Sequence, residues 1–189
     1  MLVLHAALAL TASLRKSPAV DELPHLAAGH ALWATHDYRQ QPENGILPQR
    51  WEGLTGWLSR KTLPARDHVG WTKPSVWSLG HAYFHQSGND LEQLLFAGRA
   101  LNVVWSMATG ALIFCWTRRL FGAPGAWLAL GLFAFCPTFL AHGAIATSDM
   151  CMTFFMLASV GAYWRHLQDF RAGTLVLSAL VLGLAFVAQ

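Results

Sequence analysis

Charged residues are absent from five long stretches of this chain, and that pattern limits the folds open to it. No Asp, Glu, Lys or Arg occurs in residues 1–14, 100–117, 120–148, 150–164 or 172–189. Only 12% of the 189 residues are charged and 54% are hydrophobic, whereas an average soluble domain is about 25% charged. Mainly apolar blocks of ~17–25 residues have the length of membrane-spanning helices. The sequence therefore predicts an all-α protein, a polytopic transmembrane helical bundle.

We expect about five spans and one long outer loop, at about 15–93, that holds most of the charged residues. Pro137 falls inside the third expected span, where membrane helices tolerate proline if neighbours satisfy the freed backbone groups. The expected spans are about 2–14, 96–117, 124–142, 150–164 and 173–189.

Within the loop, apolar residues recur at helical spacing, which favours short interfacial helices. Asp21 is the expected N-cap of the first, with Pro24 in its first turn. Lys61–Lys73 is expected to be irregular. The expected helices are 22–35, 47–58 and 76–86.

The basic residues of the short loops predict an orientation. Two arginines lie in the connection 118–125 and two in 165–172, while 142–149 has none. Because arginine-bearing short loops stay on the cytoplasmic side, the loops 15–93 and 142–149 are expected to face outward.

Both ends of the chain lie in apolar segments. The first run lacks the basic start of a secretory signal, and Phe186–Gln189 lies in an apolar helix. We therefore expect the chain to be the N-terminal part of a larger protein, and such a piece is expected to be inactive alone.

Other composition signals exclude some functions. The net charge of +3 comes without a basic stripe, so nucleic-acid binding is not expected. The three cysteines lie in apolar blocks and are interpreted as packing residues, not disulfides.

The expected topology brings Asp21, Glu22, Arg99 and Asp149 to the outer membrane boundary. A carboxylate there can act as general base toward an acceptor hydroxyl, and an arginine can bind a lipid phosphate. The alternative from spacing alone is structural: Asp21 as a helix cap, Glu22 as a solvated neighbour and Arg99 as an interface anchor.

Five segments, in this order, resemble the GT-C membrane glycosyltransferases of the dolichyl-phosphate-mannose protein mannosyltransferase type (glycosyltransferase family 39) and their bacterial relatives that use undecaprenyl-phosphate sugars. At Asn44–Arg50 the chain departs from the His-Pro-Pro-Leu run of many relatives. The segments are Asp21–Gly29, Thr35–Glu43, Ala97–Asn102, Arg118–Gly122 and Cys136–Asp149.

The resemblance implies residue roles. Asp21 would be the catalytic base, and Glu22 would position the base or the acceptor. Arg99 would act on the lipid phosphate, and Asp149 would line the same cavity. Two further candidates come from position and not from the resemblance. His25 is one helical turn from Asp21, where it either tunes the base or simply lies at the interface, and His142 precedes a glycine in the expected outer loop, where it would touch the cavity.

The implied reaction is transfer of a hexosyl or pentosyl group from a polyprenyl-phosphate sugar donor to an acceptor hydroxyl, with inversion. The acceptor is a protein, lipid or glycan. The implied location is a multi-pass position in the bacterial inner (plasma) membrane, among membrane lipids, with the site facing outward. The rival hypothesis is a non-catalytic lipid-carrier-binding or transporter-like membrane protein.

No cofactor is predicted and no metal site is assigned. His81 and His85 are four residues apart, as zinc ligands on a helix are, but no third ligand is evident, so a divalent metal is the lesser alternative. The tryptophans in 51–77 are expected to form an interfacial belt, and stacking of one or two on sugar rings is the alternative.

Overall fold

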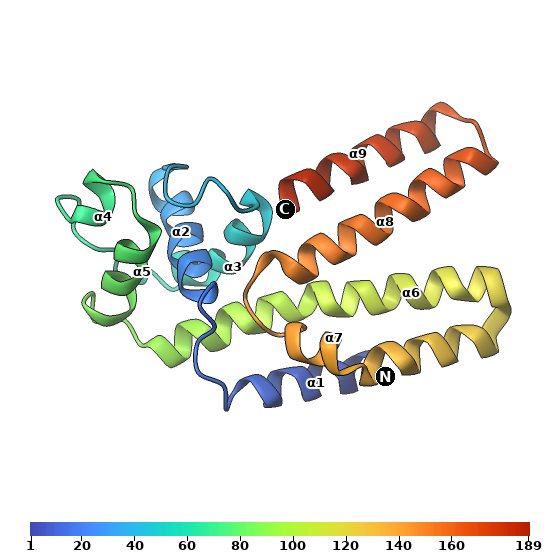
Figure 1. The fold of residues 1–189 in the computed structure, drawn as a ribbon, viewed down its shortest axis with the longest axis horizontal. Coiled ribbons are helices and arrows are strands. Elements are labelled where there is room, and N and C mark those ends of the chain that lie inside the picture. The colour runs from blue at the N-terminus through green and yellow to red at the C-terminus, as the bar shows by residue number, and fades with distance from the viewer.

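The structure, a computed structural model, describes all 189 residues, and all its regular elements are helices. They form two parts along one axis (Figure 1). One part, which we call the outer part because the sequence predicts that it faces outward, holds the short helices α2 to α5 and the start of α6. The other, the apolar part, holds α1, the rest of α6, and α7 to α9. The helices are α1 (Leu2–Ser13), α2 (Glu22–Thr35), α3 (Ile46–Leu58), α4 (Val69–Thr72), α5 (Val76–His85), α6 (Leu91–Phe135), α7 (Pro137–His142), α8 (Ser148–Gln168) and α9 (Ala172–Ala188).

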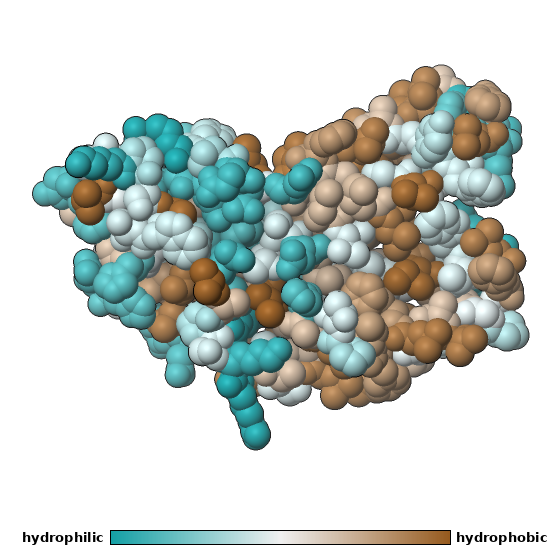
Figure 2. Space-filling model, viewed as in Figure 1, coloured by the Kyte–Doolittle hydropathy of each residue, from teal (hydrophilic) through white to brown (hydrophobic).

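The two parts differ in surface character. Hydrophilic residues cover the outer part, and hydrophobic residues cover most of the apolar part (Figure 2). Large apolar side chains along α6, α8 and α9 are exposed, among them Leu132, Val160 and Phe186. Such a surface has the character expected of helices that contact lipid.

Helix α6 is a hairpin and not one straight rod. Gly122 has φ 71° and ψ −173° inside it, so the chain reverses there and Pro124 begins the second arm. The expected spans 96–117 and 124–142 thus meet at this turn, and the return arm lies against α1 at the N-terminus (Figure 1).

The expected third span is wrong in its C-terminal half. The helix ends at Phe135, Cys136 is extended at φ −65° and ψ 123°, and Pro137 begins the separate helix α7. Proline lacks the N–H that would continue the helix, and it forces the preceding residue into an extended conformation. Pro137 therefore starts a helix here.

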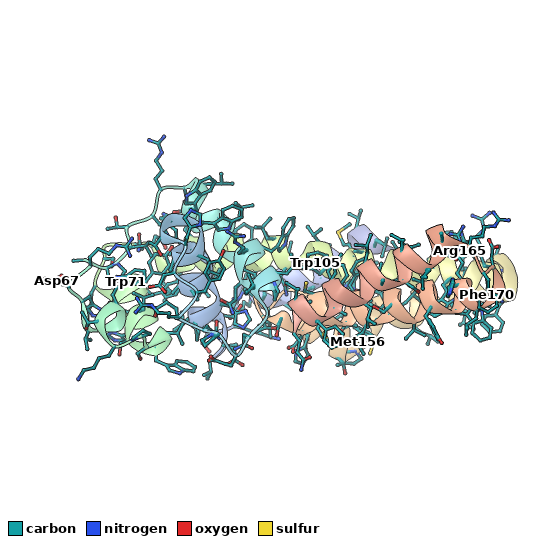
Figure 3. The ribbon with its side chains drawn as sticks, turned by 90° about the horizontal axis from the view of Figure 1, so that it is seen from above. Asp67, Trp71, Trp105, Met156, Arg165 and Phe170 are labelled. Atoms are coloured by element: carbon teal, nitrogen blue, oxygen red, sulfur yellow. The ribbon has the colours of Figure 1, made fainter.

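Five spans are not confirmed. By length and composition, α6 is the one helix apolar enough to cross a membrane, while α1 and α9 are apolar but shorter, with 12 and 17 residues. Helices do occupy each of the five expected ranges. The connections with arginines lie together at the far end of the apolar part, where Figure 3 labels Arg165 and Phe170; Asp67 and Trp71 lie at the opposite end.

The outer loop is built around α2. Its expected bounds, 22–35, are those observed, but it is not an interfacial helix. Ten of its fourteen residues are buried, because α3 and α5 pack on it. The interior contains Leu26, Ala27, Tyr83 and Leu94. The segment 61–73, expected to be irregular, contains the short helix α4.

Helices α2 and α3 cross in backbone contact. A Cβ on Gly29 would lie 1.8 Å from the Gln49 carbonyl oxygen, and one on Gly53 would lie 2.2 Å from the Gly29 carbonyl carbon. Only glycine permits this approach, so the crossing fixes where α2 presents its first turn.

Candidate functional site

Glu22 and Arg99 form a buried ion pair at the junction of the two parts. The Glu22 side chain is fully buried and Arg99 is 5% exposed. Arg99 Nε donates to Glu22 Oε1 at 2.8 Å, and its Nη2 donates to Oε2 at 2.7 Å. This two-pronged geometry is the strongest form of an arginine–carboxylate pair.

The pair ties four segments together. Glu22 also accepts hydrogen bonds from the backbone N–H groups of Ala19 (2.8 Å) and Ala146 (3.0 Å). The remaining donors of Arg99 go to the carbonyl oxygens of Ser13, Lys16 and Ser17. The end of α1, the start of α2, α6 and the loop before α8 thus share one network.

Every N–H of Arg99 has an acceptor, since a guanidinium carries five donors and five hydrogen bonds leave it. In this arrangement Arg99 has no donor left for a lipid phosphate. The structural alternative for Glu22, a solvated neighbour, is wrong because the carboxylate is buried.

Asp21 differs sharply from Glu22. It stands at the N-cap position of α2, its side chain makes no capping hydrogen bond, and the residue is exposed. Its backbone carbonyl accepts from the His25 N–H at 3.2 Å. Asp21 therefore occupies the expected position, but the expected capping role is wrong, because its carboxylate makes no capping hydrogen bond and remains open to an incoming group.

His25 pairs with a carboxylate, but not with Asp21. Its Nδ1 lies 3.2 Å from Glu52 Oε2, with both side chains buried. Burial raises the pKa of Glu52, the contact with His25 lowers it, and the carboxylates of Glu22 and Asp149 raise it further. Glu52 Oε1 has no hydrogen-bond partner.

His142 and Asp149 form a second, solvent-facing pair. His142 Nδ1 lies 3.1 Å from Asp149 Oδ2, and the side chains are 49% and 55% exposed. The Thr147 hydroxyl donates to the same oxygen at 3.1 Å. Asp149 belongs to the first turn of α8, where a carboxylate is stabilised by the helix dipole.

The sequence interpretation missed three polar residues of this junction. Glu52 lies on α3 beside Gly53 and Gly56, and its place on the small-residue face was the signal for burial. Asn102 is buried one turn after Arg99 on α6, where such residues share a face, and its amide donates to the Ile145 carbonyl. His5 of α1 contacts the Ser106 hydroxyl at 2.7 Å and the Ala134 carbonyl at 3.0 Å.

His81 and His85 lie side by side on α5 with ring centroids 5.1 Å apart. No group of three potential metal-ligating side chains occurs anywhere in the structure. The prediction that the chain needs no metal stays a prediction.

Comparison with known families decides the class of protein. Residues 76–189, more than half of the chain, match the family model of dolichyl-phosphate-mannose-protein mannosyltransferase. The chain belongs to this family. A search among curated proteins and another among solved structures gave no match.

Members of the mannosyltransferase family are integral membrane glycosyltransferases. The matched residues contain Arg99, His142 and Asp149. Asp21, Glu22 and His25 precede the match, so their roles depend on the sequence resemblance and on their geometry.

Proposed function

We propose that this mannosyltransferase-family chain transfers a sugar from a polyprenyl-phosphate carrier to an acceptor hydroxyl, with Asp21 as the general base. The observation that carries the proposal is the contrast within the acidic pair. Glu22 is buried and fully paired, while its neighbour Asp21 is exposed beside the same junction.

The reaction needs one carboxylate that can take a proton. Asp21 accepts the proton of the acceptor hydroxyl, and the acceptor oxygen attacks the anomeric carbon. The bond from that carbon to the phosphate oxygen breaks on the opposite face, and polyprenyl phosphate leaves. One displacement of this kind inverts the anomeric centre, and general-base catalysis contributes about 10²–10⁴-fold.

Glu22 and Arg99 are then positioning residues. Their ion pair fixes the first turn of α2 against α6 and the loop at Ala146. For Arg99 this replaces the phosphate-binding role implied by the resemblance, since its donors are occupied. His142 and Asp149 form a pair with side chains 49% and 55% exposed, and their proposed role is to line the acceptor space near the base.

The test uses the full-length protein in membrane vesicles with a polyprenyl-phosphate sugar. Asp21→Asn is expected to lower the rate of sugar transfer at least ~100-fold, because the amide cannot accept the proton. Glu92→Gln removes an exposed carboxylate from the first turn of α6 and is the matched control with unchanged rate.

If Asp21→Asn transfers sugar at the wild-type rate, the assignment of the base is wrong. A protein that binds the lipid carrier but gives no Asp21-dependent transfer would instead support the rival, a non-catalytic carrier-binding protein.

A further inference from the structure

Three adjoining hollows follow α5 across the outer part. The first, of about 220 Å³, begins at Leu23 and Pro24 of α2 and includes Trp77 and His81. The second, of about 390 Å³, shares Trp77 and His81 and continues to His68 and Gln86. The third, of about 370 Å³, shares His68 and Gln86. Together they form one surface groove, which we call the α5 groove.

The groove begins in the first turn of α2, two residues after the candidate base. Leu23 lies two residues after Asp21, in the first turn of α2. Helix α5 packs against this turn at Gly80, where a Cβ would lie 3.6 Å from the Leu23 carbonyl oxygen. Trp77 and His81, four residues apart and so on one face of α5, therefore flank the start of α2. The far end of the groove lies near Asp67, at the tip labelled in Figure 3.

The chemistry of the lining favours one class of ligand. Trp77 is 56% exposed, although a large aromatic side chain gains by burial. Around it lie imidazole, amide and hydroxyl groups, which donate and accept hydrogen bonds. Asp67 is the one carboxylate in the three hollows, and no Lys or Arg lines them. An aromatic face among neutral polar groups suits the apolar face and the hydroxyls of sugar rings.

We propose that the α5 groove binds the acceptor of the reaction and that this acceptor is an uncharged oligosaccharide. The inference rests on the proposed function for its direction, because the lining of the groove begins two residues after Asp21. The three hollows in series accommodate several sugar units, with the terminal unit at Leu23 and the rest extending toward Asp67. The Trp77 indole is the stacking platform near the reactive end.

Binding of neutral hexasaccharides of glucose, mannose or N-acetylglucosamine to the purified full-length protein tests the proposal. At least one hexasaccharide is expected to bind, and Trp77→Ala is expected to weaken that binding about tenfold or more, the size of loss seen for aromatic anchors. Trp77→Phe keeps an aromatic face and is expected to retain most of the affinity. Trp127→Ala removes an equally exposed tryptophan, 56%, from the apolar part and is the matched control.

Thermal unfolding of each variant separates loss of the platform from loss of the fold. If Trp77→Ala lowers the unfolding temperature, the binding measurement is repeated with His81→Ala, since His81 also lines the first two hollows. The proposal is overturned if no hexasaccharide binds, or if both groove variants bind as tightly as wild type. It is also overturned if a Ser/Thr-rich decapeptide competes for the groove more strongly than the sugars, which would indicate a protein acceptor.

The binding measurement needs no turnover, so it is independent of the proposed base. Asp21→Asn is expected to bind the hexasaccharide while transferring no sugar. If Asp21→Asn does not change the rate of transfer, the proposed function is wrong, but binding of the oligosaccharide in the α5 groove is not affected. If the groove does not bind the oligosaccharide, the groove proposal is wrong, but the proposed base is not affected.

Discussion

The Glu22–Arg99 pair is the residue-scale feature on which the outer part depends. Removing one partner of a buried ion pair leaves an uncompensated charge, which costs ~3–5 kcal/mol. Glu22→Gln is therefore expected to lower the free energy of unfolding by about that amount, as measured by denaturant unfolding in detergent.

The exposed pair of Asp169 and Arg171 is the control, since these side chains are 40% and 78% exposed. Exposed pairs contribute under ~1 kcal/mol, so Asp169→Asn is expected to have a small effect. Equal effects of the two variants would show that the buried network is not a stabilising element.

His30 makes stability depend on acid pH. It is buried in α2, its Nδ1 lies 3.0 Å from the Tyr83 hydroxyl, and burial lowers its pKa to about 4. The unfolded chain therefore binds the proton first, and stability present above the ordinary pKa of ~6.5 is lost as the pH falls toward 4. His30→Asn, whose side chain cannot be protonated, is expected to weaken the dependence of the unfolding temperature on pH between these two values.

His85→Asn removes an exposed histidine and is expected to keep the wild-type slope. Glu52 acts in the opposite direction, because its raised pKa makes its contribution fall as the pH rises. If the loss of stability at acid pH disappears only in His30→Asn, protonation of His30 is its cause.

Residue roles were only partly predictable from the sequence. The uneven distribution of charged residues predicted a site that contains Asp21, Glu22, Arg99 and Asp149. In the structure these four residues lie at the junction of the two parts. Their pairing was not predictable, because it depends on which side chain the fold buries. His25 illustrates this: one helical turn places it near Asp21, yet the side chain turns inward to Glu52 on α3.

At the scale of elements, the crossing of α2 and α3 leaves no space for a side chain. Gly53→Ala would put a methyl group 2.2 Å from Gly29 backbone atoms. Overpacking of this kind costs ~1–3 kcal/mol or more, so we expect a clear drop in unfolding temperature. Gly183→Ala in α9 is the control, since nothing lies within 4 Å of its Cβ position, and better helix propensity is expected to leave stability unchanged or slightly raised.

The helix ends that nearby capping or turn residues determine were predictable from the sequence. Asp21 and Pro24 mark the start of α2, and Gly122 with Pro124 marks the hairpin turn. The environment of α2 did not follow, because its apolar spacing fits both a lipid surface and a protein interior. The small residues Ala27, Ala28 and Gly29 admit neighbours on several sides, and that packing is a tertiary effect.

At the scale of the whole molecule, the positions of the short loops predict one orientation. Arg118, Arg119, Arg165 and Arg171 belong to connections at the same end of the apolar part, opposite Asp67 (Figure 3). In a cysteine-free full-length protein, Asp67→Cys is expected to react with an impermeant maleimide added to intact cells. Arg119→Cys and Asp169→Cys are expected to react only after lysis. Labelling of Arg119→Cys and Asp169→Cys on different sides would contradict the hairpin arrangement.

The network around Glu22 also orders events during synthesis. Glu22 precedes Arg99 by 77 residues and Ala146 by 124. The ribosome therefore delivers Glu22 to the membrane boundary well before Arg99, its guanidinium partner. It also does so before Ala146, whose backbone N–H donates a hydrogen bond to the Glu22 carboxylate. Until the α6 hairpin and the loop after α7 have been inserted, the Glu22 carboxylate lacks both the Arg99 guanidinium and the Ala146 N–H. The outer part of this protein is expected to mature last, after helices that are made later in the chain.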